Sequence, residues 1–316
     1  MLDFQKRKLL NYLLLPLSWI YILLSFLNRF YQSKKQEKIN VPIIIVGNIT
    51  VGGTGKSPLT IAIVQFLIQK NYKVGVVSRG YGGTHQKGSL LLDKSTSPIV
   101  AGDEPVMIYQ QTQVPVIVNK NRVKAVKDLI KYHKVNVIIS DDGLQHYALS
   151  RDIEIVVIDG KRRFGNGFFL PAGPLREKIS RLQSVDFIVN NGSYENNETT
   201  MFLTPLKFTN LKTSEVQEID FFAFEKCYVV SGIANPKRFW ETLKKLQIRL
   251  ETRSFADHYK FTKDDFIEIQ DMPIIMTDKD AVKCLDFATE NMWSLTVKAS
   301  LEDDFYKSLL RKINVR

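Results

Sequence analysis

The segment that most constrains the fold is a run of four apolar residues, Ile43–Val46, followed by GNITVGGTGKSP and an apolar-periodic stretch. This order is typical of a buried strand, a glycine-rich turn and a helix. Glycines at 52, 53 and 55 let the main chain curl so that successive N–H groups point inward. The sequence therefore predicts a phosphate-binding loop between a strand and a helix.

The loop fits the GxxxxGK[ST] pattern, except that Thr50 replaces the first glycine. A lysine at position 56 can reach β- and γ-phosphates, and the Ser57 hydroxyl can ligate Mg²⁺. The positive end of the following helix favours the same anion. We expect a nucleoside triphosphate to be bound by Thr50, Val51, Gly52, Gly53, Thr54, Gly55, Lys56 and Ser57.

After residue 40, short Val- and Ile-rich runs alternate with helical stretches, a pattern typical of an α/β fold with a parallel sheet. We predict a Rossmann-like P-loop core with helices on both faces of the sheet. Its strands are expected at Ile43–Val46, Val74–Ser78, Val116–Val118, Val135–Ser140, Ile153–Ile158 and Phe187–Val189, and its helices at Lys56–Gln69 and Lys120–Tyr132.

A polar, Asn-rich stretch at Asn190–Thr200 ends this block, and a shorter α/β block follows. We predict an N-terminal segment over 1–38, a P-loop core over 39–215 and a smaller α/β domain over 216–316. The second block has expected strands at Tyr228–Ser231, Pro273–Thr277 and Ser294–Val297, and expected helices at Pro236–Leu246, Lys263–Gln270 and Glu302–Ile313.

Two acidic residues, Asp141 and Asp142, follow the expected strand Val135–Ser140. Carboxylates at the C-terminal end of a parallel strand are where P-loop enzymes place a metal-linked acid. We therefore expect a Mg²⁺-linked carboxylate here, and the sequence does not separate the two residues.

The N-terminal segment Leu9–Leu27 is almost entirely apolar and has Lys and Arg on both sides. It is about as long as the shortest bilayer-crossing helices, but Asn11 and Pro16 weaken a crossing. A buried core helix is one alternative. We favour a helix in the membrane interface, with aromatic rings at headgroup level and basic residues on anionic lipid.

Lys and Arg outnumber Asp and Glu by 44 to 33, giving a formal charge of +11. We expect an anionic membrane surface or a phosphorylated substrate as the reason for this excess, and a solubility charge with no partner is the alternative. A nucleic-acid partner is not expected, because no recognition module or interleaved aromatic pattern accompanies the charge. The two cysteines exclude a disulfide scaffold and a thiolate zinc site.

An ordered set of motifs makes the comparison specific, and it strongly resembles the tetraacyldisaccharide 4'-kinase family. The resemblance implies an ATP- and Mg²⁺-dependent kinase at the cytoplasmic face of a bacterial inner membrane. It implies phosphorylation of the 4'-hydroxyl of a tetraacylated glucosamine disaccharide 1-phosphate to give lipid IVA. The motifs are LLLPLSWIY at 13–21, VGNITVGGTGKSP at 46–58, SRGYGG at 78–83, GDEP at 102–105, DDGLQH at 141–146, LPAGPLRE at 170–177 and DHY at 257–259.

The same resemblance implies that Asp103 is the catalytic base and His258 its partner, with a surface histidine as the alternative. Arg176 is expected to place a second cation on the transferring phosphoryl group, or else to form a salt bridge with Glu177 or a nearby acid. Beside Asp141 and Asp142, Glu104 and Glu177 are further candidates for the Mg²⁺ shell. Arg79 and Tyr81 are expected near nucleotide or lipid phosphate, with packing roles as the alternative.

A different class of protein remains as the alternative, a membrane-associated P-loop switch ATPase of the targeting or partitioning type. Its loop, KGGxGK[ST], is close to VGGTGKS. That class needs a lysine at the first position, where this chain has Val51, so the pattern favours the kinase.

Overall fold

The computed structural model describes residues 4–269 and 271–315, and within them the chain forms two compact units. Unit 1 takes in the described parts of 1–79 and 300–316 together with 114–202. Unit 2 takes in 80–113 and the described part of 203–299. These units interleave along the chain, whereas the domains expected from the sequence are contiguous. The reason is that two long strands, β8 (Thr199–Asn210) and β13 (Met292–Leu301), each pass from one unit into the other.

Unit 1 is built on a parallel sheet whose strands are hydrogen-bonded in the order β8, β7, β6, β1, β5, β2, β4. Every side chain of β1 and β5 is buried, which explains why the sequence there is nearly continuous Val and Ile. The remaining bounds are β1 Ile43–Gly47, β2 Val74–Ser78, β4 Val116–Val118, β5 Val137–Asp141, β6 Ile153–Asp159 and β7 Phe187–Asn191.

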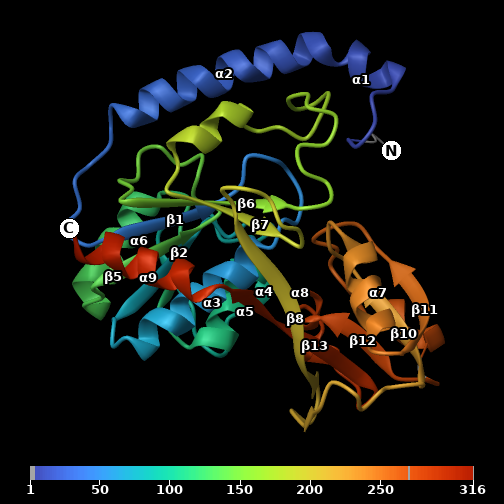
Figure 1. The fold of residues 1–316 in the computed structure, drawn as a ribbon. Coiled ribbons are helices and arrows are strands. Elements are labelled where there is room, and N and C mark those ends of the chain that lie inside the picture. The colour runs from blue at the N-terminus through green and yellow to red at the C-terminus, as the bar shows by residue number, and fades with distance from the viewer. Residues whose placement is uncertain (1–3, 270, 316) are drawn as a thin grey trace. The chain divides into compact units, whose positions relative to one another are not determined.

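Helices α3 (Lys56–Gln69) and α6 (Arg122–His133) pack on this sheet (Figure 1). The bounds of α3 agree with the sequence prediction. Helix α6 begins later than the expected Lys120, because the Asn121 side chain caps it by accepting a hydrogen bond from the Lys124 N–H. The C-terminal helix α9 (Asp303–Asn314) also belongs to unit 1, where the Tyr306 ring lies 4.5 Å from the ring of Phe66.

The N-terminal segment forms two helices, α1 (Leu9–Leu13) and α2 (Leu15–Ser33). Figure 1 shows α2 along one side of unit 1, with the segment 160–184 between it and the sheet. The side chain of Asn11 donates a hydrogen bond of 2.8 Å to the Ala172 carbonyl, and that of Ser18 donates one of 2.9 Å to the Phe169 carbonyl. Among residues 4–269 and 271–315, no helix has both the length and the apolar character needed to cross a membrane.

In unit 2 the strands pair in parallel in the order β11, β10, β12, β13, and they belong to the same continuous sheet as the strands of unit 1. The core of unit 2 includes Phe208, Val229, Leu243 and Trp293. The bounds are β3 Leu90–Leu91, α4 Pro98–Ala101, α5 Asp103–Thr112, β9 Val216–Gln217, β10 Lys226–Ser231, α7 Pro236–Lys245, β11 Arg249–Ser254, β12 Ile274–Thr277 and α8 Asp278–Ala281.

Two local expectations need correction. The helix expected at Lys263–Gln270 is a 3₁₀ helix over Lys263–Ile269, and Gln270 lies outside the described residues. The stretch Asn190–Thr200, interpreted as the polar end of a block, contains the end of β7 and the start of β8. Asn190 and Asn191 are buried, and their side-chain amides are hydrogen-bonded to Glu198 and to the Thr54 carbonyl, so polarity was a poor guide to exposure at these two positions.

Candidate active site

The phosphate loop connects β1 to α3 in unit 1. Gly52 and Gly55 have φ values of +99° and +98°, in the left-handed region that favours glycine. The Val51 N–H donates a hydrogen bond of 2.8 Å to the carbonyl of Pro174, so the segment containing LPAGPLRE braces the loop. The glycines thus do what the sequence pattern predicts.

The loop is also held from β7 and from the segment after β6. The Asn191 side-chain amide donates a hydrogen bond of 2.9 Å to the Thr54 carbonyl. The guanidinium of Arg162, paired with the buried Asp159, contacts the Gly53 carbonyl. Neither Asn191 nor Arg162 was expected at the site from the sequence. An asparagine at the C-terminal end of an apolar strand is the signal that could have indicated the first.

The two acids after β5 have different surroundings. Asp141 is fully buried and accepts a hydrogen bond of 3.1 Å from the Thr60 hydroxyl on α3. Asp142 lies 3.6 Å from the Lys56 ammonium and 3.2 Å from the Arg176 guanidinium. Burial acts to raise the pKa of Asp142, but Lys56, Arg176 and Arg122 outweigh it and hold that pKa far below its usual range. Asp142 is therefore an anion between two cations of the loop region.

Arg176 and Glu177 are neighbours in sequence but belong to different networks. In addition to its ion pair with Asp142, Arg176 donates a hydrogen bond of 3.1 Å to the side-chain oxygen of Asn48. Glu177 accepts from the Tyr147 hydroxyl and, at 2.7 Å, from the Gln145 amide. Burial, followed by the Glu177 charge, raises the pKa of Tyr147 to about 12. The alternative of an ion pair with Glu177 or a nearby acid is confirmed in its second form, because the acid that Arg176 pairs with is Asp142 beside the phosphate loop.

The donor set of unit 1 fits a nucleotide with Mg²⁺. Lys56 and Arg176 supply cations beside the loop, and Ser57, Asp141 and Asp142 supply the hard oxygens that Mg²⁺ prefers. Among the described residues, no cluster of three or more His, Cys, Asp or Glu side chains could hold a metal ion.

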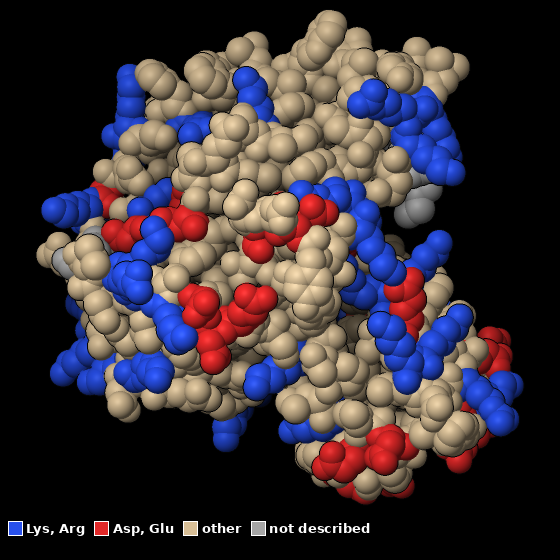
Figure 2. Space-filling view, in the orientation of Figure 1, with Lys and Arg blue, Asp and Glu red and all other residues tan. Residues whose placement is uncertain are grey.

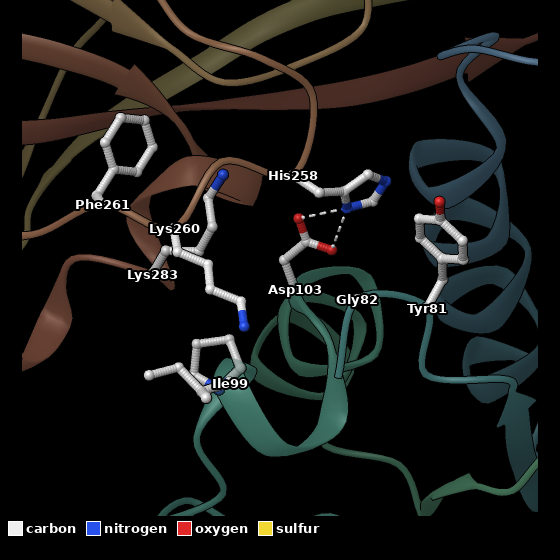
Figure 3. Close-up of a pocket in the computed structure, with 9 residues that line it drawn as sticks. Tyr81, Gly82, Ile99, Asp103, His258, Lys260, Phe261 and Lys283 are labelled. Carbon is white, nitrogen blue, oxygen red and sulfur yellow. Dashed lines mark hydrogen bonds and ion pairs between the residues drawn. The ribbon is translucent and has the colours of Figure 1, made fainter. Parts of the chain in front are cut away.

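Unit 2 contains a His–Asp pair. His258 Nδ1 lies 3.1 and 3.0 Å from the two carboxylate oxygens of Asp103, which is the first residue of α5 and is buried (Figure 3). Burial opposes ionisation of Asp103, but the His258 hydrogen bond and the Lys279 charge give a lowered pKa overall. Burial likewise opposes protonation of His258, and the Asp103 contact outweighs it, so the pKa of His258 is raised. His258 is therefore a partner of Asp103 and not a surface histidine.

A pocket of unit 2 opens beside this pair (Figure 3). The Tyr81 ring is 5.0 Å from that of His258, so Tyr81 lies in the pocket and not in a packed core. The pocket combines apolar and aromatic surface with two lysines beside the carboxylate. Its lining is Tyr81, Gly82, Pro98, Ile99, Asp103, His258, Lys260, Phe261 and Lys283.

Two further expected residues have surroundings that bear on their roles. Glu104 pairs with Lys279 at 3.1 Å within unit 2, a contact that the sequence did not indicate. Arg79 is exposed at the end of unit 1's strand β2 and acts electrostatically on Arg122 and His146. Their functions in metal and phosphate binding stay predictions.

Comparison with known proteins decides the family. The sequence model described as Tetraacyldisaccharide-1-P 4'-kinase (LpxK) matches residues 10–314. The chain belongs to this family.

Individual members are similar over nearly the whole chain. The tetraacyldisaccharide 4'-kinase of Ruthia magnifica subsp. Calyptogena magnifica is 51% identical over 310 residues, covering 97% of this chain and 98% of the relative. That of Psychromonas ingrahamii is 46% identical over 307 residues, with 96% and 95% covered. A crystal structure of LpxK from Aquifex aeolicus in complex with ATP matches with a TM-score of 0.78 at 27% identity, covering 96% of this chain and 100% of that one. The mixed α/β architecture described above is thus the fold of the LpxK family.

Proposed function

We propose that this protein transfers the γ-phosphoryl group of ATP to the 4'-hydroxyl of tetraacyldisaccharide 1-phosphate, giving lipid IVA. Family membership over residues 10–314 supports the reaction, and it favours a kinase over a switch ATPase. The observation that carries the proposal within the structure is the contact of His258 Nδ1 with both oxygens of Asp103, since a lipid kinase needs a base and a switch ATPase does not.

The nucleotide half of the reaction is assigned to unit 1. The N–H groups of the loop and the side chains of Lys56 and Arg176 are proposed to neutralise the charge that develops on the phosphoryl oxygens. When bound, Mg²⁺ supplies Lewis-acid stabilisation of the same oxygens, held by Ser57 and by Asp141 or Asp142. The ion pairs of Asp142 with Lys56 and Arg176 keep these cations oriented.

The acceptor half is assigned to Asp103 and His258. As the 4'-oxygen bonds to phosphorus, its proton passes to the Asp103 carboxylate, and the bond between the β–γ bridging oxygen and phosphorus breaks to release ADP. The contacts with His258 and Lys279 lower the pKa of Asp103, so its carboxylate is a weak base for a sugar hydroxyl and depends on exact placement. The Nδ1–H of His258 stabilises the ionised carboxylate before transfer and orients it toward the hydroxyl.

The lipid half of the proposal rests on two helices that bury polar side chains and expose apolar ones. In α1 and α2 the buried side chains are the polar Asn11 and Ser18, while Leu9, Trp19 and Phe26 are 76%, 68% and 63% exposed. A contiguous apolar surface of this kind marks a partner or a membrane. Figure 2 shows a broad tan surface over these helices with blue Lys and Arg side chains near its ends. We assign it to the cytoplasmic face of the bacterial inner membrane, since a tetraacylated substrate stays in the bilayer.

The test is transfer of radiolabelled γ-phosphate from ATP to purified tetraacyldisaccharide 1-phosphate, in detergent with Mg²⁺. The expected result is a labelled lipid that disappears in Lys56→Ala and persists in Lys70→Ala, a control at the exposed end of the same helix. ATP hydrolysis stimulated by membranes, with no labelled lipid, would instead favour the switch ATPase.

A further inference from the structure

The partly buried ammonium of Lys279 lies among the acids that surround the Asp103–His258 pair, at the start of the short helix α8. Its Nζ is 3.1 Å from Glu104, 3.4 Å from Asp257 and 4.0 Å from Asp103. Charge balance among these carboxylates is one role of the lysine. A fourth contact indicates another.

That fourth contact is with the histidine ring itself. Lys279 Nζ lies 3.5 Å from His258 Nε2, on the side of the ring opposite Asp103. An ammonium group only donates hydrogen bonds, so it is compatible with an Nε2 that carries a lone pair and no proton. An ionised carboxylate only accepts, so the two Asp103 oxygens require the proton on Nδ1. Both ends of the ring therefore favour the same tautomer.

One neighbour acts in the opposite direction. The Asp257 carboxylate lies 3.8 Å from His258 Nε2, where it favours a proton on that nitrogen. Asp257 is also paired with Lys279, which offsets its charge. Without the ammonium, the Asp257 carboxylate would no longer be offset by Lys279, and we expect the preference at this nitrogen to reverse.

The position of Lys279 is fixed by contacts that do not involve the His–Asp pair. The preceding residue, Asp278, accepts a hydrogen bond of 2.7 Å from Gln111 on α5 and one of 3.1 Å from Thr296 on β13. Helix α5 also carries Asp103, so the hydrogen bond between Gln111 and Asp278 links the helix of the base to the helix of the lysine.

We propose that Lys279 is a positioning residue that keeps His258 Nε2 unprotonated and thereby holds the His258 Nδ1–H on the Asp103 carboxylate. The catalytic consequence rests on the proposed function, since it matters only where Asp103 accepts a proton. With the other tautomer, two lone pairs would face each other between Nδ1 and Asp103, and the carboxylate would lose its orientation.

The direct test is the ¹⁵N spectrum of the histidine side chains in the full-length protein, in mildly alkaline buffer without nucleotide or metal. The His258 signals are assigned with His258→Gln. The surrounding acids outweigh burial and raise the pKa of Lys279, so its charge persists under these conditions. We expect a pyridine-like Nε2 in the wild type, a protonated Nε2 in Lys279→Met, and wild-type signals in Lys244→Met, an exposed lysine of α7. A protonated Nε2 in the wild type, or an unchanged Nε2 in Lys279→Met, overturns the proposal.

A second test uses the kinase assay as a double-mutant cycle. Lys279→Met should lower kcat roughly ten- to hundred-fold, less than loss of a base at roughly 10²–10⁴-fold, with the KM for ATP little changed. In a His258→Gln background, Lys279→Met should lower kcat little further. In the wild-type background, Lys279→Arg should retain part of the activity that Lys279→Met loses. If Lys279→Met lowered kcat by the same factor in the wild-type and His258→Gln backgrounds, the proposal would be overturned. Absence of lipid phosphorylation by the wild type would count against the proposed function only, because the spectra decide the tautomer without turnover.

Discussion

The side-chain amide of Asn191, at the end of β7, donates a hydrogen bond of 2.9 Å to the main-chain carbonyl of Thr54 in the phosphate loop. This contact leaves no room beside Gly55, where an added Cβ would lie 2.3 Å from the Asn191 nitrogen. The loop is therefore shaped by its own glycines and by a neighbouring strand together.

Gly55→Ala should weaken ATP binding and lipid phosphorylation. It introduces a side chain at a φ of +98°, a strain of about 1–2 kcal/mol, and forces Asn191 away from Thr54. The matched control is Gly88→Ala, where φ is +79° but nothing lies within 4 Å of the added Cβ. Isothermal titration with ATP compares them, and equal affinities in the two variants would contradict this account of the loop.

Asp103→Asn should lower kcat by roughly 10²–10⁴-fold while leaving the KM for ATP nearly unchanged. The amide keeps the size of the carboxylate but cannot accept the hydroxyl proton as a carboxylate does. Steady-state kinetics with both substrates varied measures the effect, with Asp286→Asn, an exposed acid of unit 2, as the control. A loss confined to KM would remove Asp103 from the role of base.

His146 should make the free energy of unfolding depend on pH. Burial, followed by the charges of Arg122, Arg151 and Arg79, lowers the pKa of His146 from 6.5 to about 4. Between these values the unfolded chain binds a proton that the folded chain does not, so the contribution is complete above about pH 6.5 and is lost as pH falls toward about 4. The expected loss is about 1–3 kcal/mol, measured by urea unfolding across this interval.

His146→Gln should remove this part of the pH dependence, whereas His133→Gln, at the C-terminal end of α6, should retain it. The same slope in wild type and His146→Gln would show that the coupling lies elsewhere.

The double substitution Trp19→Glu and Leu23→Glu should reduce association of the protein with anionic vesicles. These side chains are 68% and 58% exposed, so placing charge on them disfavours burial in lipid without disturbing the core. Co-sedimentation and thermal unfolding measure the two effects, with Tyr132→Glu on α6, 65% exposed, as the control. Equal sedimentation of both variants would place membrane attachment on another surface.

The sequence was enough to predict the phosphate loop, most of the strands and helices, and the family. Each depends on local chemistry: glycines for positive φ, periodic apolar residues for buried elements, and an ordered motif set. The bounds of α3 agreed with the prediction for this reason. The strand β8 was not predicted, because it begins within the polar stretch Asn190–Thr200 and is stabilised by parallel pairing with β7, which the sequence does not reveal.

What only the tertiary structure decided is which distant side chains meet. Three contacts of the site join residues far apart in the chain. They are the ion pair of Arg176 with Asp142, the hydrogen bond from Asn191 to Thr54, and the ion pair of Lys279 with Glu104. Sequence spacing carries little information on such contacts, since they arise when packed elements bring the ends of different strands and helices together. The sequence by itself determined the chemistry available to the site, and the packing determined which charges that chemistry faces.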